Sequence, residues 1–325
     1  MPKKFFGKAL SVLTAMLILI SATAGCAKEE TAGKTDGTSG TTARSTAAST
    51  TAGITTAPAV VTNVSDNSVW YHYQVINILL IGYDYGSKNQ PYPRSDSMII
   101  LSLNKLNKRI SIVSLSRAAY VTIPGHRSTR LNAAHAYGGP ELLVKTIELN
   151  YKIRIDNYIS IGFDSFTKII NALGGIDVSL TAKELGSLNK NEGLNISRGP
   201  GVYRLNGTLA LAYSRMRSID NDKARTGRQR TVLKKIAEKV KSLSLSQAVN
   251  FLDEFYPLVH TDFTEKELAL QAAEGLSYIK YPIATAMIPE AAPLVMRNGY
   301  QVLLLNWPQE RHRLHSILYP GITPQ

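Results

Sequence analysis

The sequence has little cysteine and few acidic residues. A single cysteine, Cys26, stands among 325 residues, which excludes a disulfide framework and a cysteine-rich zinc site. There are 24 Asp and Glu against 37 Lys and Arg, which gives a formal net charge of +13 at pH 7. A positive surplus of this size indicates an anionic partner, such as a phosphate group, an acidic polymer or a lipid surface.

The sequence also lacks the common catalytic motifs. It has no phosphate loop ending in GK[ST], no dinucleotide-binding glycine fingerprint and no GxSxG elbow. The six histidines are scattered, and although His312 and His315 share a helix face, no third ligand accompanies them, so a solvated helix is favoured over a metal site. No DNA-reading motif is found either, and together with the export signal described next this argues against nucleic acid as a partner.

The first 26 residues are typical of an export signal. A short basic segment, residues 1–8, precedes 17 mostly apolar or small residues at 9–25, and Cys26 follows. Residues 22–25 before Cys26 resemble a bacterial lipobox, in which the thiol is lipidated, although Thr23 stands where Leu is usual. A lipid-modified Cys26, an uncleaved anchor helix and full secretion all remain open. Each places the rest of the chain outside the cytoplasm, and the first two anchor it to the outer face of the cell membrane.

A low-complexity segment separates this signal from the folded part. Thr, Ser, Gly and Ala supply 23 of the 27 residues from 31 to 57, and no aromatic residue occurs between Phe6 and Trp70. Such a segment cannot bury enough apolar surface to fold. We therefore predict a disordered tether at 27–68, with an end-to-end distance of about 35 Å for ~40 residues.

Apolar patterning after the tether predicts strands alternating with helices. The continuous apolar run at 75–82 is typical of a buried central strand. Other strands are predicted at 97–103, 109–115, 158–162, 176–180, 284–288 and 301–305, with a hairpin turn at 104–108. Helices are predicted from 138–140 to 150, from a cap at Asp164 to Gly174, from 206, and at 227–242, 246–256, 264–278 and 308–318. The expected fold is a single α/β domain, residues 69–325, with a central mixed β-sheet flanked by helices.

Charged side chains gather in two places in this domain. Asp84 follows the 75–82 strand, and Arg94 and Asp96 lead into the next one. Arginines are dense from 215 to 230, and the set is Arg215, Arg217, Arg225, Arg228 and Arg230, with Gln229 among them. Arg117 ends the 109–115 strand and can join either group.

The spacing of these residues predicts which of them are neighbours. Arg215 and Arg217 are two apart and share a face only in an extended chain, so we expect a switch from helix to strand near Tyr213. Arg225 and Gln229 are four apart, which makes them neighbours on a helix.

Carboxylates and arginines in this pattern indicate a phosphate site. Two carboxylates at strand ends suit Mg²⁺, which prefers oxygen ligands and usually keeps waters and substrate phosphates. Several guanidinium groups suit a phosphate ester, which they bind through paired hydrogen bonds. Together they favour phosphoryl transfer. The alternatives are that Asp84 and Asp96 are turn or cap residues, and that the arginines form a solvated helix face or a polyanion patch.

At these residues the sequence resembles the LytR-CpsA-Psr family of extracytoplasmic cell-wall enzymes. The matching segments are NILLIGYD (77–84), RSDSMIILSLN (94–104), RISIVSLSR (109–117), RLNAAHAYGGPELLVKTIE (130–148), IDNYISIGFDSFTKIINALGGIDVSL (155–180) and LNGTLALAYSRMRSIDNDKARTGRQRTVL (205–233). The resemblance covers essentially everything after the tether.

The resemblance implies a mixed-sheet α/β domain with a tunnel for a polyprenyl phosphate. It also implies transfer of an anionic glycopolymer, such as teichoic acid or capsular polysaccharide, from a polyprenyl-pyrophosphate carrier to peptidoglycan. By position, Asp84 and Asp96 match acids linked to Mg²⁺ (or Mn²⁺). The residues that match the pyrophosphate-binding set are Arg94, Arg117, Arg215, Arg217, Arg225 and Gln229. We assign Asp96, Arg117 and Arg94 to catalysis, with Asp96 as the candidate general base.

One departure from the family pattern leaves other functions open. Members commonly carry Asp directly after the arginine equivalent to Arg117, and here that residue is Ala118. Reduced activity or an altered metal dependence is the resulting hypothesis. The missing acid makes a weakened polyprenyl-phosphate- or polymer-binding protein one alternative to a transferase. The nearest enzyme alternative is a hydrolase that removes the polymer from the same carrier with water as acceptor. A transcriptional regulator is excluded by the predicted export.

Overall fold

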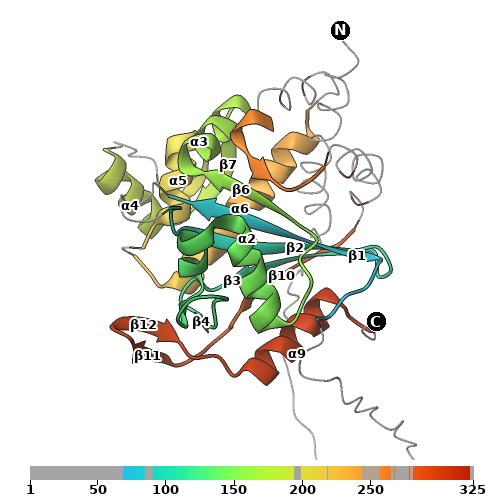
Figure 1. The fold of residues 1–325 in the computed structure, drawn as a ribbon. Coiled ribbons are helices and arrows are strands. Elements are labelled where there is room, and N and C mark those ends of the chain that lie inside the picture. The colour runs from blue at the N-terminus through green and yellow to red at the C-terminus, as the bar shows by residue number, and fades with distance from the viewer. Residues whose placement is uncertain are drawn as a thin grey trace, which may run out of the picture. The chain divides into compact units, whose positions relative to one another are not determined.

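The computed structural model describes residues 69–84, 91–193, 199–217, 219–243, 256–264 and 281–322, and the single residues 247, 251, 267 and 278 (Figure 1). The export signal, Cys26 and the tether lie outside the described residues, as do most of the helices predicted at 246–256 and 264–278. No helix within these ranges has both the length and the apolar composition of a membrane span.

A mixed sheet of six strands forms the centre of the domain, as predicted. The strand order is β10–β3–β2–β1–β6–β9. The bounds are β1 (Val75–Tyr83), β2 (Ser95–Asn104), β3 (Arg109–Leu115), β6 (Asn157–Gly162), β9 (His260–Thr261) and β10 (Ile283–Ile288). β1 is antiparallel to β2 and parallel to β6, and β10 is parallel to β3. The predicted hairpin is confirmed, since β2 and β3 pair antiparallel across the turn at 105–108.

Both faces of this sheet are covered, which explains the continuous apolar run of β1. Neighbouring strand residues point to opposite faces. Leu79 belongs to a core shared with Leu143 of α2 (Asn132–Tyr151) and Leu314 of α9 (Trp307–Leu318). Ile78 belongs to a second core, against which Leu233 of α6 (Asp222–Lys241) packs. Ile78 and Leu79 are both fully buried, so β1 has no face left for solvent.

The remaining helices form a third core with α6. They are α3 (Phe163–Ala172), α4 (Ala182–Glu192) and α5 (Gly207–Arg215), which lie together at the left of Figure 1. α3 and α5 cross closely at Gly207, where a Cβ atom would come within 2.1 Å of the Thr167 carbonyl oxygen. Only glycine fits this crossing.

Short strand pairs complete the fold. β7 (Ile176–Leu180) pairs with β8 (Gly201–Leu205), and β4 (Tyr120–Val121) pairs with β5 (Thr129–Arg130). β11 (Leu294–Arg297) and β12 (Tyr300–Leu303) form a hairpin near the C-terminus. A 3₁₀ turn spans Tyr256–Leu258. β12 and α9 confirm the predicted closing strand and helix.

Several predicted details are wrong. α5 continues through Arg215 and does not change to strand near Tyr213, because Tyr213 is buried in the core with α6. α2 begins at Asn132, and its predicted start at 138–140 is a kink with φ of +69° at Gly139.

The predictions for three other helices also differ from the structure. Gly162 stands at the α3 cap position and Asp164 lies in the first turn. α6 begins at Asp222, α4 was not predicted, and His315 is buried against the Tyr151 carbonyl instead of solvated.

Candidate active site

Asp96 is the point at which arginines from three separate segments meet. It is the second residue of β2, and its side chain is 21% exposed. Arg117 Nη1 lies 2.9 Å from Asp96 Oδ1, and Arg217 Nη2 lies 3.6 Å from the same oxygen. Arg225, itself buried, donates from Nη1 to the Asp96 carbonyl oxygen at 3.3 Å. The structure therefore brings both predicted groups of charged residues together.

Asp84 joins the same assembly through a second pair. Arg215 Nη2 lies 2.9 Å from Asp84 Oδ2, and the Arg215 guanidinium stands 4.5 Å from the centre of the Phe163 ring. Arg215 ends α5, and Met216 after it has a non-helical ψ of 127°. Both guanidinium groups therefore reach acids at the ends of the central strands β1 and β2, although the helix does not stop at Tyr213.

An additional arginine, Arg130, belongs to this region and was missed by sequence reasoning. The guanidinium groups of Arg94 and Arg130 lie 6.0 and 5.7 Å from the centre of the Tyr300 ring, and Arg130 Nε donates to the Gln301 carbonyl at 2.7 Å. Burial lowers the pKa of Arg130, and so do the positive charges of Arg117 and Arg94. The three guanidinium groups of Arg94, Arg117 and Arg130 therefore repel one another, and a bound anion would reduce this repulsion. The signal available was the position of Arg130 at the start of a family-like segment.

An apolar cavity lies next to Asp96, Arg215 and Arg225. It measures about 180 Å³ and lies between β1, β2 and β6 on one side and α3, α5 and α6 on the other. Its apolar lining includes Leu80, Ile99, Ile161, Phe166, Leu211 and Val232. Asp96, Arg215, Arg225 and Gln229 also line it, which joins an apolar space to a polar one. This is the shape that a phosphate group carrying an apolar chain requires.

The comparison with known families decides the relationship. The LytR_cpsA_psr family pattern matches residues 37–312, most of the chain.

The chain belongs to the LytR-CpsA-Psr family.

The chain is similar to relatives named as cell-wall transferases and to others named as regulatory proteins. The polyisoprenyl-teichoic acid–peptidoglycan teichoic acid transferase TagT of Bacillus subtilis is 37% identical over 172 residues, which are 52% of this chain and 53% of TagT. The matched part thus spans about half of TagT. A solved structure described as TagT bound to LIIa-WTA superposes with a TM-score of 0.62 at 29% identity, covering 76% of this chain and 90% of that one.

A second solved structure of a family member holds a lipid. It is described as YwtF (TagT) with bound octaprenyl pyrophosphate, and it matches with a TM-score of 0.58 at 27% identity, covering 76% of this chain and 91% of that one.

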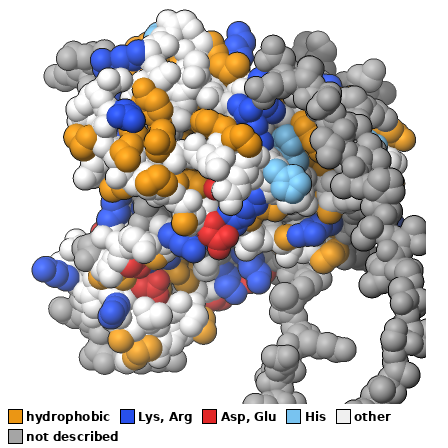
Figure 2. Space-filling view, turned by 90° about the horizontal axis from the view of Figure 1, so that it is seen from below, with side chains coloured by type: hydrophobic (Ala, Val, Ile, Leu, Met, Phe, Trp, Pro, Cys, Tyr) orange, Lys and Arg blue, Asp and Glu red, His pale blue; other side chains and the backbone are white. Residues whose placement is uncertain are grey.

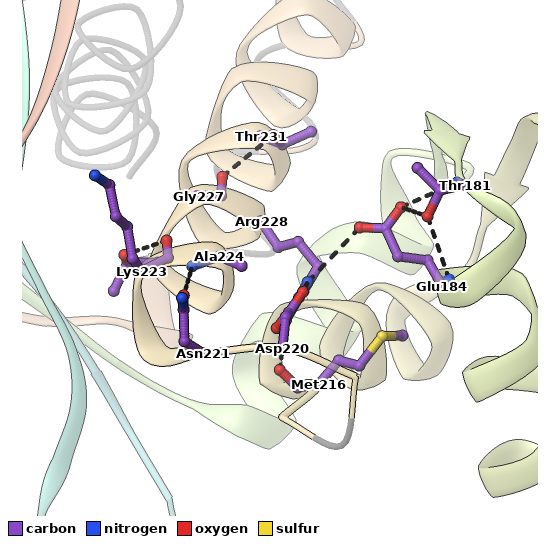
Figure 3. A network of polar contacts seen from close by, with 11 residues as sticks. Thr181, Glu184, Met216, Asp220, Asn221, Lys223, Ala224, Gly227, Arg228 and Thr231 are labelled. Carbon is purple, nitrogen blue, oxygen red and sulfur yellow. Dashed lines mark hydrogen bonds and ion pairs between the residues drawn. The ribbon is translucent and has the colours of Figure 1, made fainter.

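Two members of the arginine group do not face the acids. Arg228 is 4% exposed, and it donates to both carboxylate oxygens of Asp220, at 2.5 and 2.8 Å, and to the Met216 carbonyl at 2.6 Å (Figure 3). Glu184 of α4 lies 3.7 Å from the same guanidinium. Arg230 donates to Ser114 Oγ at 2.8 Å. These two arginines hold the scaffold, whereas Arg215, Arg217 and Arg225 surround the site.

The acids suit a metal that arrives together with a phosphate ligand. Among the described residues, no group of three or more His, Cys, Asp and Glu could hold a metal ion alone. Mg²⁺, however, commonly binds through one or two carboxylates plus substrate phosphates. Asp84 and Asp96, each paired with an arginine, are the two carboxylates that would hold such an ion. On the face shown in Figure 2, basic side chains lie around acidic ones, beside hydrophobic side chains.

Proposed function

We propose that this LytR-CpsA-Psr protein transfers an anionic glycopolymer of the teichoic acid or capsular type from a polyprenyl-pyrophosphate carrier to peptidoglycan, outside the cell membrane. The observation that carries the proposal is the apolar cavity that meets Arg215, Arg225 and Gln229 beside Asp96. The names of the relatives and the lipid in the TagT structure support it.

The site performs this reaction by binding and charge neutralisation. The prenyl chain occupies the apolar cavity, and the pyrophosphate lies among Arg94, Arg117, Arg215, Arg217, Arg225 and Gln229. A hydroxyl of the acceptor sugar attacks the sugar-linked phosphorus, so that an O–P bond forms while the phosphoanhydride bond breaks. The carrier leaves as polyprenyl phosphate. Guanidinium groups stabilise the charge on the transferring phosphoryl oxygens.

Asp96 is our candidate for accepting the hydroxyl proton. Arg117 and Arg217 both approach its Oδ1 atom and hold the carboxylate at the strand end. Asp84 and Asp96 would hold a Mg²⁺ ion, or Mn²⁺ in its place, and the metal would neutralise the pyrophosphate charge.

Product analysis tests the proposal. The purified full chain is incubated with a saccharide linked to octaprenyl pyrophosphate, peptidoglycan fragments and Mg²⁺, and octaprenyl phosphate release is followed. We expect equal amounts of released carrier and of saccharide joined to peptidoglycan. Arg217→Ala should slow release about a hundredfold, since it removes a donor to the transferring group. Chelation with EDTA should also slow it.

Arg204→Ala is the matched control, because Arg204 forms an exposed pair with Asp177 between β8 and β7 and does not line the apolar cavity. Carrier release without a joined product would mean a hydrolase. Binding of the carrier with no release under any metal condition would mean a binding protein. Either result would overturn the transferase.

A further inference from the structure

His135 is a buried side chain close to the start of β2. It belongs to α2 and is 2% exposed. Its Nδ1 atom lies 2.7 Å from the carbonyl oxygen of Pro93, the residue directly before Arg94. Because a carbonyl oxygen only accepts hydrogen bonds, Nδ1 carries the proton of the ring and donates it. Burial lowers the pKa of His135, so the ring is neutral at pH 7 and has no second N–H.

The hydrogen bond from His135 fixes the backbone where the sheet stops doing so. The pairing of β1 with β2 ends at Tyr83 and Ser95. Arg94 stands one residue before this last pair, so the ladder holds the chain on one side of it only. The peptide on the other side of Arg94 is the one whose carbonyl accepts from His135.

Two tyrosine rings hold the imidazole of His135 in place. Tyr83 stacks on it with 5.6 Å between ring centres and 23° between ring planes, and Tyr92 approaches it edge-on at 6.2 Å and 67°. A Cβ atom at Gly162 would come within 3.1 Å of the Tyr83 ring. One at Gly139 would come within 3.0 Å of the Tyr92 ring. This close packing leaves the imidazole little freedom to turn.

Arg94 is a residue whose position needs such support. Its guanidinium lies 6.0 Å from the centre of the Tyr300 ring, and its positive charge lowers the pKa of Arg130 beside the same ring. Like charges favour moving apart, so a fixed backbone is required to keep Arg94 there. We propose that His135 is a positioning residue that holds Arg94 within reach of the carrier pyrophosphate through the Pro93 carbonyl. This inference rests on the proposed function.

Two polar substitutions of His135 test the proposal, with octaprenyl pyrophosphate as the ligand of the full chain. The amide nitrogen of asparagine can take the place of Nδ1, whereas that of glutamine reaches the place of Nε2. Nε2 has no hydrogen-bond partner among the described residues. His135→Gln, which loses the hydrogen bond, should therefore raise the Kd about fivefold. His135→Asn, which keeps it, should raise the Kd less than about twofold.

A second comparison asks whether His135 acts through Arg94. Arg94→Ala alone should raise the Kd about tenfold, because it removes a charged partner of the pyrophosphate. In that background His135→Gln should change the Kd less than about twofold, since the two positions are coupled. His312→Gln, at an exposed histidine of α9, is the matched control and should leave the Kd unchanged. Circular dichroism checks that each variant is folded, and His135→Ala replaces His135→Gln if the latter does not fold.

Several outcomes would overturn the inference. An unchanged Kd in His135→Gln would show that the hydrogen bond is dispensable, and an equal rise in His135→Asn would show that Nδ1 is not the atom that matters. A fivefold effect that persists in the Arg94→Ala background would assign His135 to general stability. An unchanged Kd in Arg94→Ala would remove Arg94 from the proposed phosphate-binding set as well, whereas failure of the His135 comparisons alone leaves the proposed function standing.

Discussion

At the scale of single residues, Ala118 is the main departure from the family pattern. Main-chain hydrogen bonds hold the backbone at this position. The Ala118 N–H donates to Ser116 Oγ, and the Ala118 carbonyl accepts from the Leu303 N–H at 2.8 Å. Arg117 has a carboxylate partner in Asp96, on a different strand. The structure therefore orients Arg117 without an acid at position 118.

We expect Ala118→Asp to change the transfer rate less than about fivefold at saturating Mg²⁺, since a new carboxylate would duplicate a partly exposed ion pair worth about 1 kcal/mol or less. Asp96→Asn, in contrast, should slow transfer about a hundredfold because the arginines lose their shared anion and the acceptor loses its base. Rates of octaprenyl phosphate release measure both. A tenfold or larger gain from Ala118→Asp would instead show that the natural site is weakened.

At the scale of elements, the segment 216–221 between α5 and α6 contains Arg217, and hydrogen bonds from Arg228 fix its position. This side chain comes from α6 and reaches back to Met216 and Asp220, at the two ends of the connection. Glu184 adds a contact to α4. A buried, bidentate arginine of this kind fixes geometry more strongly than a surface pair does. The placement of Arg217 thus depends on a residue that makes no contact with the acids in the site.

Arg228→Met should lower the free energy of unfolding by about 2 kcal/mol, because the hydrogen bonds it removes involve a charged donor. For a domain of this size the melting temperature should fall by about 4–8 °C. Octaprenyl pyrophosphate should also bind more weakly, as Arg217 loses its fixed position. Thermal unfolding followed by circular dichroism, with a binding assay below the transition, checks both effects.

Arg204→Met, which breaks the exposed pair with Asp177, serves as the comparison and should leave the melting temperature nearly unchanged. An equal loss in the two variants would contradict the structural role of Arg228.

At the scale of the whole described domain, the apolar cavity is small for its proposed ligand. Its volume of about 180 Å³ is close to the ~150 Å³ of a cavity that holds one benzene molecule. A prenyl chain is longer, so we expect the sheet and the helices α3, α5 and α6 to move apart when it enters. Binding then replaces some protein–protein contacts with protein–lipid contacts and closes the core around the chain.

A ligand that binds only the folded state raises its stability by about 2.7 kcal/mol at a concentration of 100 times Kd. We therefore expect octaprenyl pyrophosphate to raise the melting temperature by about 5–10 °C. Inorganic pyrophosphate at the same concentration should raise it far less, because it leaves the apolar cavity empty. Differential scanning calorimetry checks the difference. Equal shifts with both ligands would contradict binding of the chain in the cavity.

Local patterns in the sequence determined much of the scaffold. The apolar run of β1, the hairpin turn between β2 and β3, and the helix stop at Gly174 after α3 are short-range signals, and all three predictions are confirmed. The acids and arginines of the site also followed from their positions at strand ends and from the family resemblance. Asp84, Asp96, Arg117, Arg215, Arg217 and Arg225 do converge.

Only the tertiary structure decided which arginines face the site. Arg225 and Arg228 are both buried on α6, yet one reaches Asp96 and the other Asp220, because packing against α5 and β7 sets the rotation of the helix. Arg130 meets Arg94 at Tyr300, a ring 170 residues further along the chain. The periodicity of a sequence predicts which residues share a face within one helix or one strand. Contacts between distant segments arise from how the hydrophobic faces of whole elements fit together, and that fit positions the phosphate-binding groups.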